Sequence, residues 1–162
     1  MEIAIPAGVE SASQIRLVGE GQAGIRGGPA GDLYLSLHIT PHEFFGRNGS
    51  DLLYELPISF TQAALGDAVQ IPTLQGPVEL KIPAGIQHGT SIRSKGRGIP
   101  RLRSNHKGDL LVKIRVVTPK SLTPEQERLL KELSQSLDPP ERSTEESTNW
   151  FDRFKGTFNG SS

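Results

Sequence analysis

The chain has 162 residues, in which 18 lysine and arginine residues balance 18 aspartate and glutamate residues, and it contains no cysteine. The balanced charge gives no net field that would attract nucleic acid or an acidic membrane, and the lack of cysteine excludes disulfides, cysteine-based zinc sites and thiol catalysis. The 18 glycine and 12 proline residues favour many short strands joined by turns, no segment approaches the length of a membrane span, and the first residues lack the basic and apolar regions of a signal peptide.

Three strands are expected before Pro41. Ile3 and Ile5 alternate with polar or small residues before a turn, and residues 14–18 predict the next strand. Residues 24–31 are too rich in glycine for regular structure and are interpreted as a mobile loop. Residues 32–39 predict the clearest half-buried strand, because leucine or isoleucine occupies every second position from 33 to 39.

A junction follows at residues 41–50, which carry two adjacent phenylalanines and then the turn signal Asn48-Gly49. Residues 52–59 predict another strand, in which Pro57 favours an edge or a bulge. Residues 60–65 predict a short helix capped by Gly66. The remaining strands are expected at residues 68–72, 78–82, 91–94 and 109–117.

The pattern changes to that of a helix after residue 119. Thr123 is a good N-cap, Pro124 suits the first helical position, and Gln126 completes a capping box. The helix carries one apolar stripe, formed by Leu129, Leu130, Leu133 and Leu137. This stripe must be buried either on the chain's own domain or on a second copy, and the sequence leaves both alternatives open.

The C-terminal segment differs in composition from the rest of the chain. Residues 141–149 are polar, acidic and rich in serine and threonine, which predicts a flexible tether. The following tail contains the only tryptophan, and we expect it to become ordered by docking, with an unstructured terminus as the alternative. Its aromatic residues fall on one helical face: Trp150, Phe151, Phe154 and Phe158.

An internal duplication organises the whole chain. Residues 2–21 and 79–98 are identical at nine of twenty positions without a gap, at the constant offset in numbering that takes Glu2 to Glu79. The same offset relates Gly31-Asp32-Leu33 to Gly108-Asp109-Leu110. Self-similarity of this density predicts two copies of one structural module.

Local motifs give little support for catalysis. Residues 19–24 match the glycine pattern of dinucleotide sites, but the next residues cannot start the helix that such a site requires. Asp32 and Asp109 hold equivalent repeat positions and are interpreted as turn caps rather than as a catalytic pair. Neither a Ser-His-Asp set nor a Gly-x-Ser-x-Gly motif is present, and the four histidines lack metal-site spacing, so we expect no enzyme and no metal.

Two features remain as candidate binding surfaces. A basic segment surrounds the second glycine loop, and it is interpreted mainly as a solvated loop face because no aromatic residue is interleaved to stack bases. The phenylalanines Phe44 and Phe45 lie beside apolar strands, where an exposed strand edge next to an apolar pocket could accept an extended peptide. One of these two phenylalanines is expected to be core. The basic residues are Arg93, Lys95, Arg97, Arg101, Arg103 and Lys107.

Several segments, in order, resemble the C-terminal half of DnaJ-type J-domain co-chaperones, with a tail like those of bacterial and plastid members. They include Ile-Pro-Ala-Gly-Val at 5–9, Gly-Pro-Ala-Gly-Asp-Leu-Tyr at 28–34, His-Glu-Phe-Phe-Gly-Arg at 42–47 and Lys-Gly-Arg-Gly-Ile-Pro at 95–100. The resemblance extends from about residue 2 to residue 137. It implies a mainly β fold with two tandem β-sandwich-like domains, the first incomplete, followed by a C-terminal dimerisation helix.

The resemblance also implies the function and the domain limits. Residues 1–48 would end the first client-binding domain, 49–120 would form the second β domain, 121–137 the dimerisation helix, and 138–162 the tether and aromatic tail. Clients would be non-native polypeptides, handed to a DnaK-type ATP-dependent chaperone during protein folding and stress. The implied client-binding residues are Ile15, Leu17 and Phe45, and the implied homodimer contacts are Leu129, Leu130 and Leu133.

Departures from the family pattern limit these expectations. The chain has no His-Pro-Asp motif and no Cys-x-x-Cys motif. We therefore expect a piece of a longer protein that lacks the J domain and the zinc-binding region and so carries no cofactor itself. We expect it in the cytoplasm or a plastid stroma, without nucleic-acid or membrane partners. The alternative function is a β-sandwich assembly scaffold or glycan-binding module without client binding.

Overall fold

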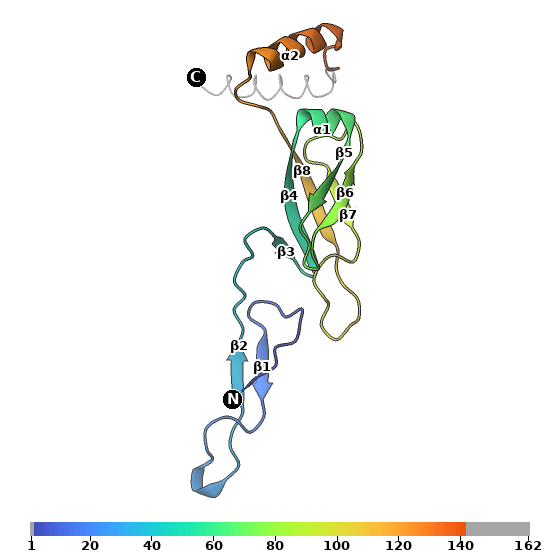
Figure 1. Cartoon of the computed structure of the whole chain (residues 1–162). Coiled ribbons are helices and arrows are strands. Elements are labelled where there is room, and N and C mark those ends of the chain that lie inside the picture. The colour runs from blue at the N-terminus through green and yellow to red at the C-terminus, as the bar shows by residue number, and fades with distance from the viewer. Residues whose placement is uncertain (1, 142–162) are drawn as a thin grey trace, which may run out of the picture. The chain divides into compact units, whose positions relative to one another are not determined.

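The computed structural model describes residues 2–141, and the aromatic tail of the sequence lies outside the described residues. The chain divides into two compact units at residue 118, and each unit is described by itself. Strands dominate the first unit and a helix the second, which confirms the expected mainly β fold with a C-terminal helix (Figure 1). The limits of the domains within the first unit stay a prediction.

The first copy of the module is a two-stranded antiparallel ribbon. Strand β1 (Gln14–Leu17) pairs with β2 (Leu33–Ser36), and the loop between them contains a short 3-10 turn at Ile25–Gly27. The leucine and isoleucine positions of β2 and its continuation are half-buried, while the positions between them are exposed, as their alternation predicts.

The strand expected around Ile3 and Ile5 does not form, and this prediction was wrong. These residues belong to no strand. Their repeat equivalents form β6 (Val78–Ile82), which is a strand because β5 (Asp67–Ile71) pairs along its whole length. No such partner accompanies the first segment among residues 2–141, and alternation alone does not make a ladder.

The second copy, together with the segment that precedes it in the chain, forms a four-stranded sheet in the order β3-β4-β8-β7. Its strands are β3 (Gly46–Asn48), β4 (Asp51–Ser59), β7 (Ser91–Ser94) and β8 (Leu110–Val117). The central pair, β4 and β8, is parallel. Since β3 covers only the beginning of β4, Pro57 lies where β4 is hydrogen-bonded on one side alone, as expected for proline in a strand.

The core of the second copy lies between this sheet and the β5–β6 ribbon. Helix α1 (Phe60–Leu65) contributes Ala63 and is held by a capping box between Ser59 and Gln62, with Gly66 at its C-terminal end. Leu110, Val112 and Ile114 of β8 are completely buried. The other buried apolar residues are Phe45, Leu52, Leu56, Ile58, Ile71, Leu80, Ile82 and Ile86.

The duplication is visible in the hydrogen-bonded register. Gln14 pairs with Ser36 in the first copy, and Ser91 pairs with Lys113 in the second, so both partners are displaced by the offset of the sequence repeat. The loop backbones repeat as well, because Arg26 and Arg103 have positive φ angles of 58° and 56° at equivalent positions. One backbone plan is therefore built twice.

The second unit contains helix α2 (Pro124–Ser136), which begins as the sequence predicts. The Thr123 side chain accepts from the backbone N–H of Gln126 and the Gln126 side chain accepts from that of Thr123, which completes the capping box. Leu129 and Leu133 are 50% and 45% exposed, and Leu130 is half-buried. Within residues 2–141 no helix is long and apolar enough to cross a membrane.

Candidate functional site

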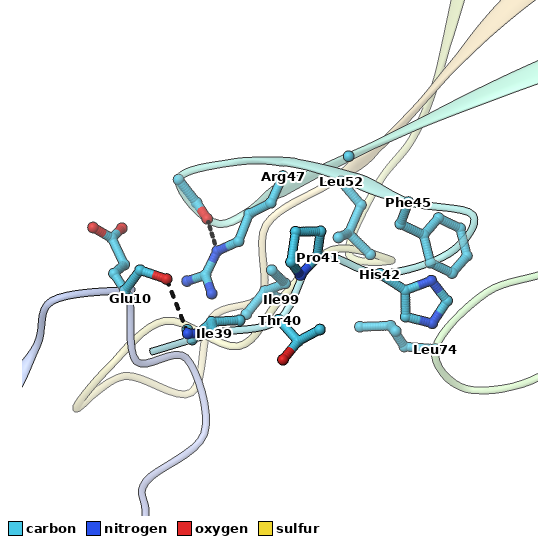
Figure 2. Close-up of a pocket in the computed structure, with 13 residues that line it drawn as sticks. Glu10, Ile39, Thr40, Pro41, His42, Phe45, Arg47, Leu52, Leu74 and Ile99 are labelled. Carbon is cyan, nitrogen blue, oxygen red and sulfur yellow. Dashed lines mark hydrogen bonds between the residues drawn. The ribbon is translucent and has the colours of Figure 1, made fainter. Parts of the chain in front are cut away.

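A pocket of about 610 Å³ lies where the end of the first copy meets the second copy (Figure 2). One wall comes from the segment after β2, and another from β3 and the start of β4. The remaining residues come from the segment before β1, the β5–β6 turn and the loop after β7. The apolar lining residues are Ile39, Pro41, Phe45, Leu52, Leu74 and Ile99.

Arg47 of β3 holds the walls together. Its Nε donates to the carbonyl oxygen of Gly49 at 2.8 Å, and its Nη1 donates to the carbonyl oxygen of Val9 at 2.8 Å. A weaker bond of 3.3 Å joins Nη2 to the carbonyl oxygen of Gly8. One guanidinium therefore fixes both the β3–β4 turn and the first segment of the chain, which gives the pocket a defined shape.

Gly8 lets these two parts approach closely. Its φ is +89°, and a side chain here would run into the carbonyl oxygen of Pro100. Its repeat equivalent, Gly85, has a similar φ of +80° but open space around it. The glycine thus serves a turn in both copies and a close contact only in the first.

Two rings of an aromatic cluster, those of His42 and Phe45, form the floor of the pocket. The rings of His42 and Phe45 are 5.0 Å apart, and those of Phe45 and Tyr54 are 5.8 Å apart. Phe45 is only 8% exposed and belongs to the core, whereas Phe44 is 60% exposed. The expectation that one of these phenylalanines is core is confirmed.

The rim of the pocket offers both apolar surface and backbone groups. Leu74 is 49% exposed, which leaves its side chain open to a ligand. Strand β3 is one of the two edge strands of the sheet within the described residues, and its residues Gly46 and Arg47 line the same pocket. A strand edge of this kind beside an apolar pocket is the arrangement that accepts extended peptides.

The structure separates the three residues expected to bind clients. Phe45 lines the pocket, but Ile15 and Leu17 lie on β1, half-buried, and do not line it. The residues expected to form the dimer, Leu129, Leu130 and Leu133, share one stripe of α2. Their roles stay predictions.

Sequence reasoning missed most of the pocket. Leu74 and Ile99 lie in loops without hydrophobic periodicity, and Arg47 was noted only as part of a motif. The Asn48-Gly49 turn was the one usable signal, because it brings β3 back beside β4. The other contacts join parts of the chain that only the tertiary structure brings together.

In each copy, one aspartate carboxylate accepts hydrogen bonds from the glycine loop and from an arginine side chain, and we call this arrangement the aspartate clamp. The backbone N–H of Gly19 donates to Asp32 at 3.1 Å, and Arg16 Nε donates to the same carboxylate at 2.6 Å. The second copy repeats this with Gly96 at 2.9 Å and Arg93 at 2.9 Å around Asp109. The interpretation of both aspartates as turn caps is confirmed.

The clamp of the second copy predicts an acid-dependent loss of stability. The hydrogen bond from Gly96 and the charge and hydrogen bond of Arg93 lower the pKa of Asp109, although desolvation raises it. A lowered folded-state pKa stabilises the fold above the unfolded-state pKa, and this contribution disappears as the pH falls through the folded value. In urea unfolding, Asp109→Asn should therefore lower the midpoint at pH 7, and its difference from the unmodified chain should shrink towards pH 3.

Glu20→Gln is the control for this measurement, since the Glu20 carboxylate has no hydrogen-bond partner among residues 2–141. A difference between Asp109→Asn and the unmodified chain that stays constant from pH 7 to pH 3 would contradict the clamp.

No group of three or more metal-ligating side chains occurs in the part of the chain that the structure describes. Because the sequence also lacks cysteine, these residues do not fit a cysteine-liganded zinc site.

Comparisons with known proteins all indicate the same family. The family model for the DnaJ C terminal domain matches residues 1–119. The chain is 46% identical over 160 residues to the protein named "Chaperone protein DnaJ" of Halalkalibacterium halodurans, covering 99% of the chain and 43% of that relative. It is 48% identical over 162 residues to the protein of that name from Geobacillus sp. strain WCH70, covering 100% and 42%. For the Parageobacillus thermoglucosidasius protein the identity is 52% over 135 residues, covering 83% and 36%. The chain thus spans about two fifths of the length of these relatives.

Proposed function

Since the chain belongs to the DnaJ C-terminal domain family, we propose that it binds non-native polypeptide clients at the pocket beside β3. It would act as part of a DnaJ co-chaperone that delivers clients to a DnaK-type chaperone. The observation that carries the proposal is a pocket with an apolar floor, next to β3, an edge strand of the sheet. Its relatives bear the name of a chaperone, a class without catalysis of its own.

The geometry suits weak, sequence-tolerant binding. A client residue such as leucine or phenylalanine would enter between Leu74 and the aromatic floor, while its backbone pairs with β3. Burying one such side chain contributes about 1.5–3 kcal/mol. A peptide held by one or two such anchors dissociates readily, which a protein that passes its clients onward requires.

The proposal includes Ile15 and Leu17 as a second apolar contact for the client. Both are half-buried on the ribbon of the first copy, where a longer client could reach them. It also includes dimerisation through α2, because Leu129 and Leu133 expose about half of their surface. Two protomers would offer two pockets to one client and so raise its apparent affinity. The cytoplasm or plastid stroma stays the expected location.

The test replaces Leu74 rather than Phe45. Removing a buried phenylalanine costs about 3–5 kcal/mol and would confound binding with unfolding. Leu74→Glu places a charge at the mouth of the pocket without disturbing the core, because Leu74 is half exposed. We expect this variant to bind a labelled apolar peptide at least fivefold more weakly and to lose most of its ability to delay aggregation of a chemically unfolded reporter.

Leu65→Glu is the matched control, since Leu65 is 80% exposed on α1 and does not line the pocket. It should bind the peptide like the unmodified chain. If Leu74→Glu binds equally well, the pocket is not the client site. If the unmodified chain neither binds peptide nor delays aggregation yet remains dimeric, the alternative of an assembly scaffold is favoured.

A further inference from the structure

The glycine loops of the two copies share one backbone. Residues 18–31 and 95–108 have equal length, and Gly21 and Gly98 donate to equivalent carbonyl oxygens at 2.7 and 2.8 Å. Both loops contain an arginine with positive φ at the same position, and both are closed by the aspartate clamp. The base of the loop therefore has the same backbone in both copies, although the side chains differ.

The charges of these loops differ strongly. The first loop carries one acidic and one basic residue, Glu20 and Arg26. The second loop has five basic residues and no acidic residue before Asp109. At the positions where Lys95, Arg97, Arg101 and Lys107 stand, the first copy has Val18, Glu20, Gly24 and Ala30. Only Arg103 has a basic counterpart, Arg26.

These cations are presented to solvent on a preformed hairpin. The backbone N–H of Arg101 donates to the carbonyl oxygen of His106 at 2.9 Å, and Pro100 and Lys107 form a β-bridge. Four of the five side chains are exposed, and Arg97 is half-buried. None of the five forms an ion pair with another residue of the segment 2–141.

The chemistry of the loop favours a polypeptide over a nucleic acid as its partner. Residues 95–107 contain no aromatic side chain on which a base could stack. Leu102 lies between two arginines at the turn and is 45% exposed, so the loop offers apolar contact between positive charges.

We propose that residues 95–107 form a binding surface for acidic polypeptide segments, which the equivalent loop of the first copy lacks. Carboxylates of the partner pair with Arg101, Arg103 and Lys107, and an apolar residue between them contacts Leu102. This surface is separate in chemistry from the apolar pocket, although Ile99 of the same loop lines that pocket.

The test uses the full chain, fluorescein-labelled octaglutamate as the probe and octaglutamine as its neutral counterpart. Fluorescence anisotropy at low salt should show binding of octaglutamate alone, weakening as salt screens the charges. Arg101→Glu/Lys107→Glu should reduce the affinity at least tenfold. Arg26→Glu, in the loop of the first copy, should change it less than twofold.

A reciprocal variant separates loop function from loss of fold. Glu20→Arg/Ala30→Lys gives the first loop charges found in the second, at two exposed positions, and should increase octaglutamate binding. Equal effects of Arg101→Glu/Lys107→Glu and Arg26→Glu would overturn the proposal. So would displacement of octaglutamate by an oligothymidylate or by phosphatidylglycerol vesicles at lower charge concentration than by unlabelled octaglutamate.

The outcome is distinguishable from that of the client-binding test. Leu74→Glu should weaken binding of the apolar peptide more than it weakens binding of octaglutamate. Arg101→Glu/Lys107→Glu should weaken binding of octaglutamate and change the affinity for the apolar peptide less than twofold. Failure of one surface therefore leaves the other standing.

Discussion

Replacing Gly108 with alanine should destabilise the first unit by about 3 kcal/mol or more, at the upper end of the cost of overpacking. Gly108 lies two residues before the start of β8 and faces the β3–β4 turn. A Cβ atom here would overlap the backbone carbonyl of Ser50 and approach Asp51 Oδ1 to 2.9 Å. The turn cannot yield easily, because Ile99 donates to Ser50 and Asp109 donates to Asp51, both at 2.8 Å.

Urea unfolding of the full chain, followed by circular dichroism, measures this effect. The matched control is Gly31→Ala at the equivalent position of the first copy. There the added Cβ meets only the carbonyl oxygen of Gln22 at 3.9 Å, so the change should stay within about 0.5 kcal/mol, as for ordinary surface substitutions. Equal unfolding midpoints for Gly108→Ala and the unmodified chain would show that the turn moves aside at little cost.

This pair of glycines shows what the repeat could and could not predict. The constant offset of the repeat identified Gly31 and Gly108 as equivalent, and the structure confirms an equivalent backbone. The repeat did not indicate that the β3–β4 turn lies against Gly108. Within the described residues, no equivalent turn lies against Gly31. Equivalent sequence positions predict equivalent local structure but not equivalent tertiary contacts.

The elements predicted best are those whose signals are local. The caps at Thr123 and Gly66 and the alternation of residues 33–39 depend on neighbouring residues, and the structure has them as expected. The strand expected at Ile3 and Ile5 failed because a strand also requires a partner. For the same reason the pocket could be predicted only in part. Phe45 was identified from its motif, whereas Leu74 and Ile99 come to line the pocket only through the tertiary structure.

A second large effect is expected in α2, where Leu129→Glu/Leu133→Glu should convert the proposed dimer to monomers. The two leucines of each protomer expose about half of their surface, and burying a whole leucine contributes about 1.5–3 kcal/mol. Four such side chains in a dimer therefore contribute on the order of 4 kcal/mol, which corresponds to about a thousandfold in dissociation constant. Sedimentation velocity over a range of protein concentrations measures the shift.

The control variant places the same change of charge on the opposite side of the helix. Lys131→Gln/Gln135→Glu also lowers the net charge by two, and both side chains are exposed away from the leucine stripe. It should remain dimeric, so a loss of dimer in both variants would indicate a general charge effect rather than contact through the stripe. Monomers in the unmodified chain at all concentrations would instead favour the alternative that the stripe packs within its own chain. That outcome would mean that a client is not bound by two pockets of one dimer, but it would leave the proposal for the pocket itself unchanged.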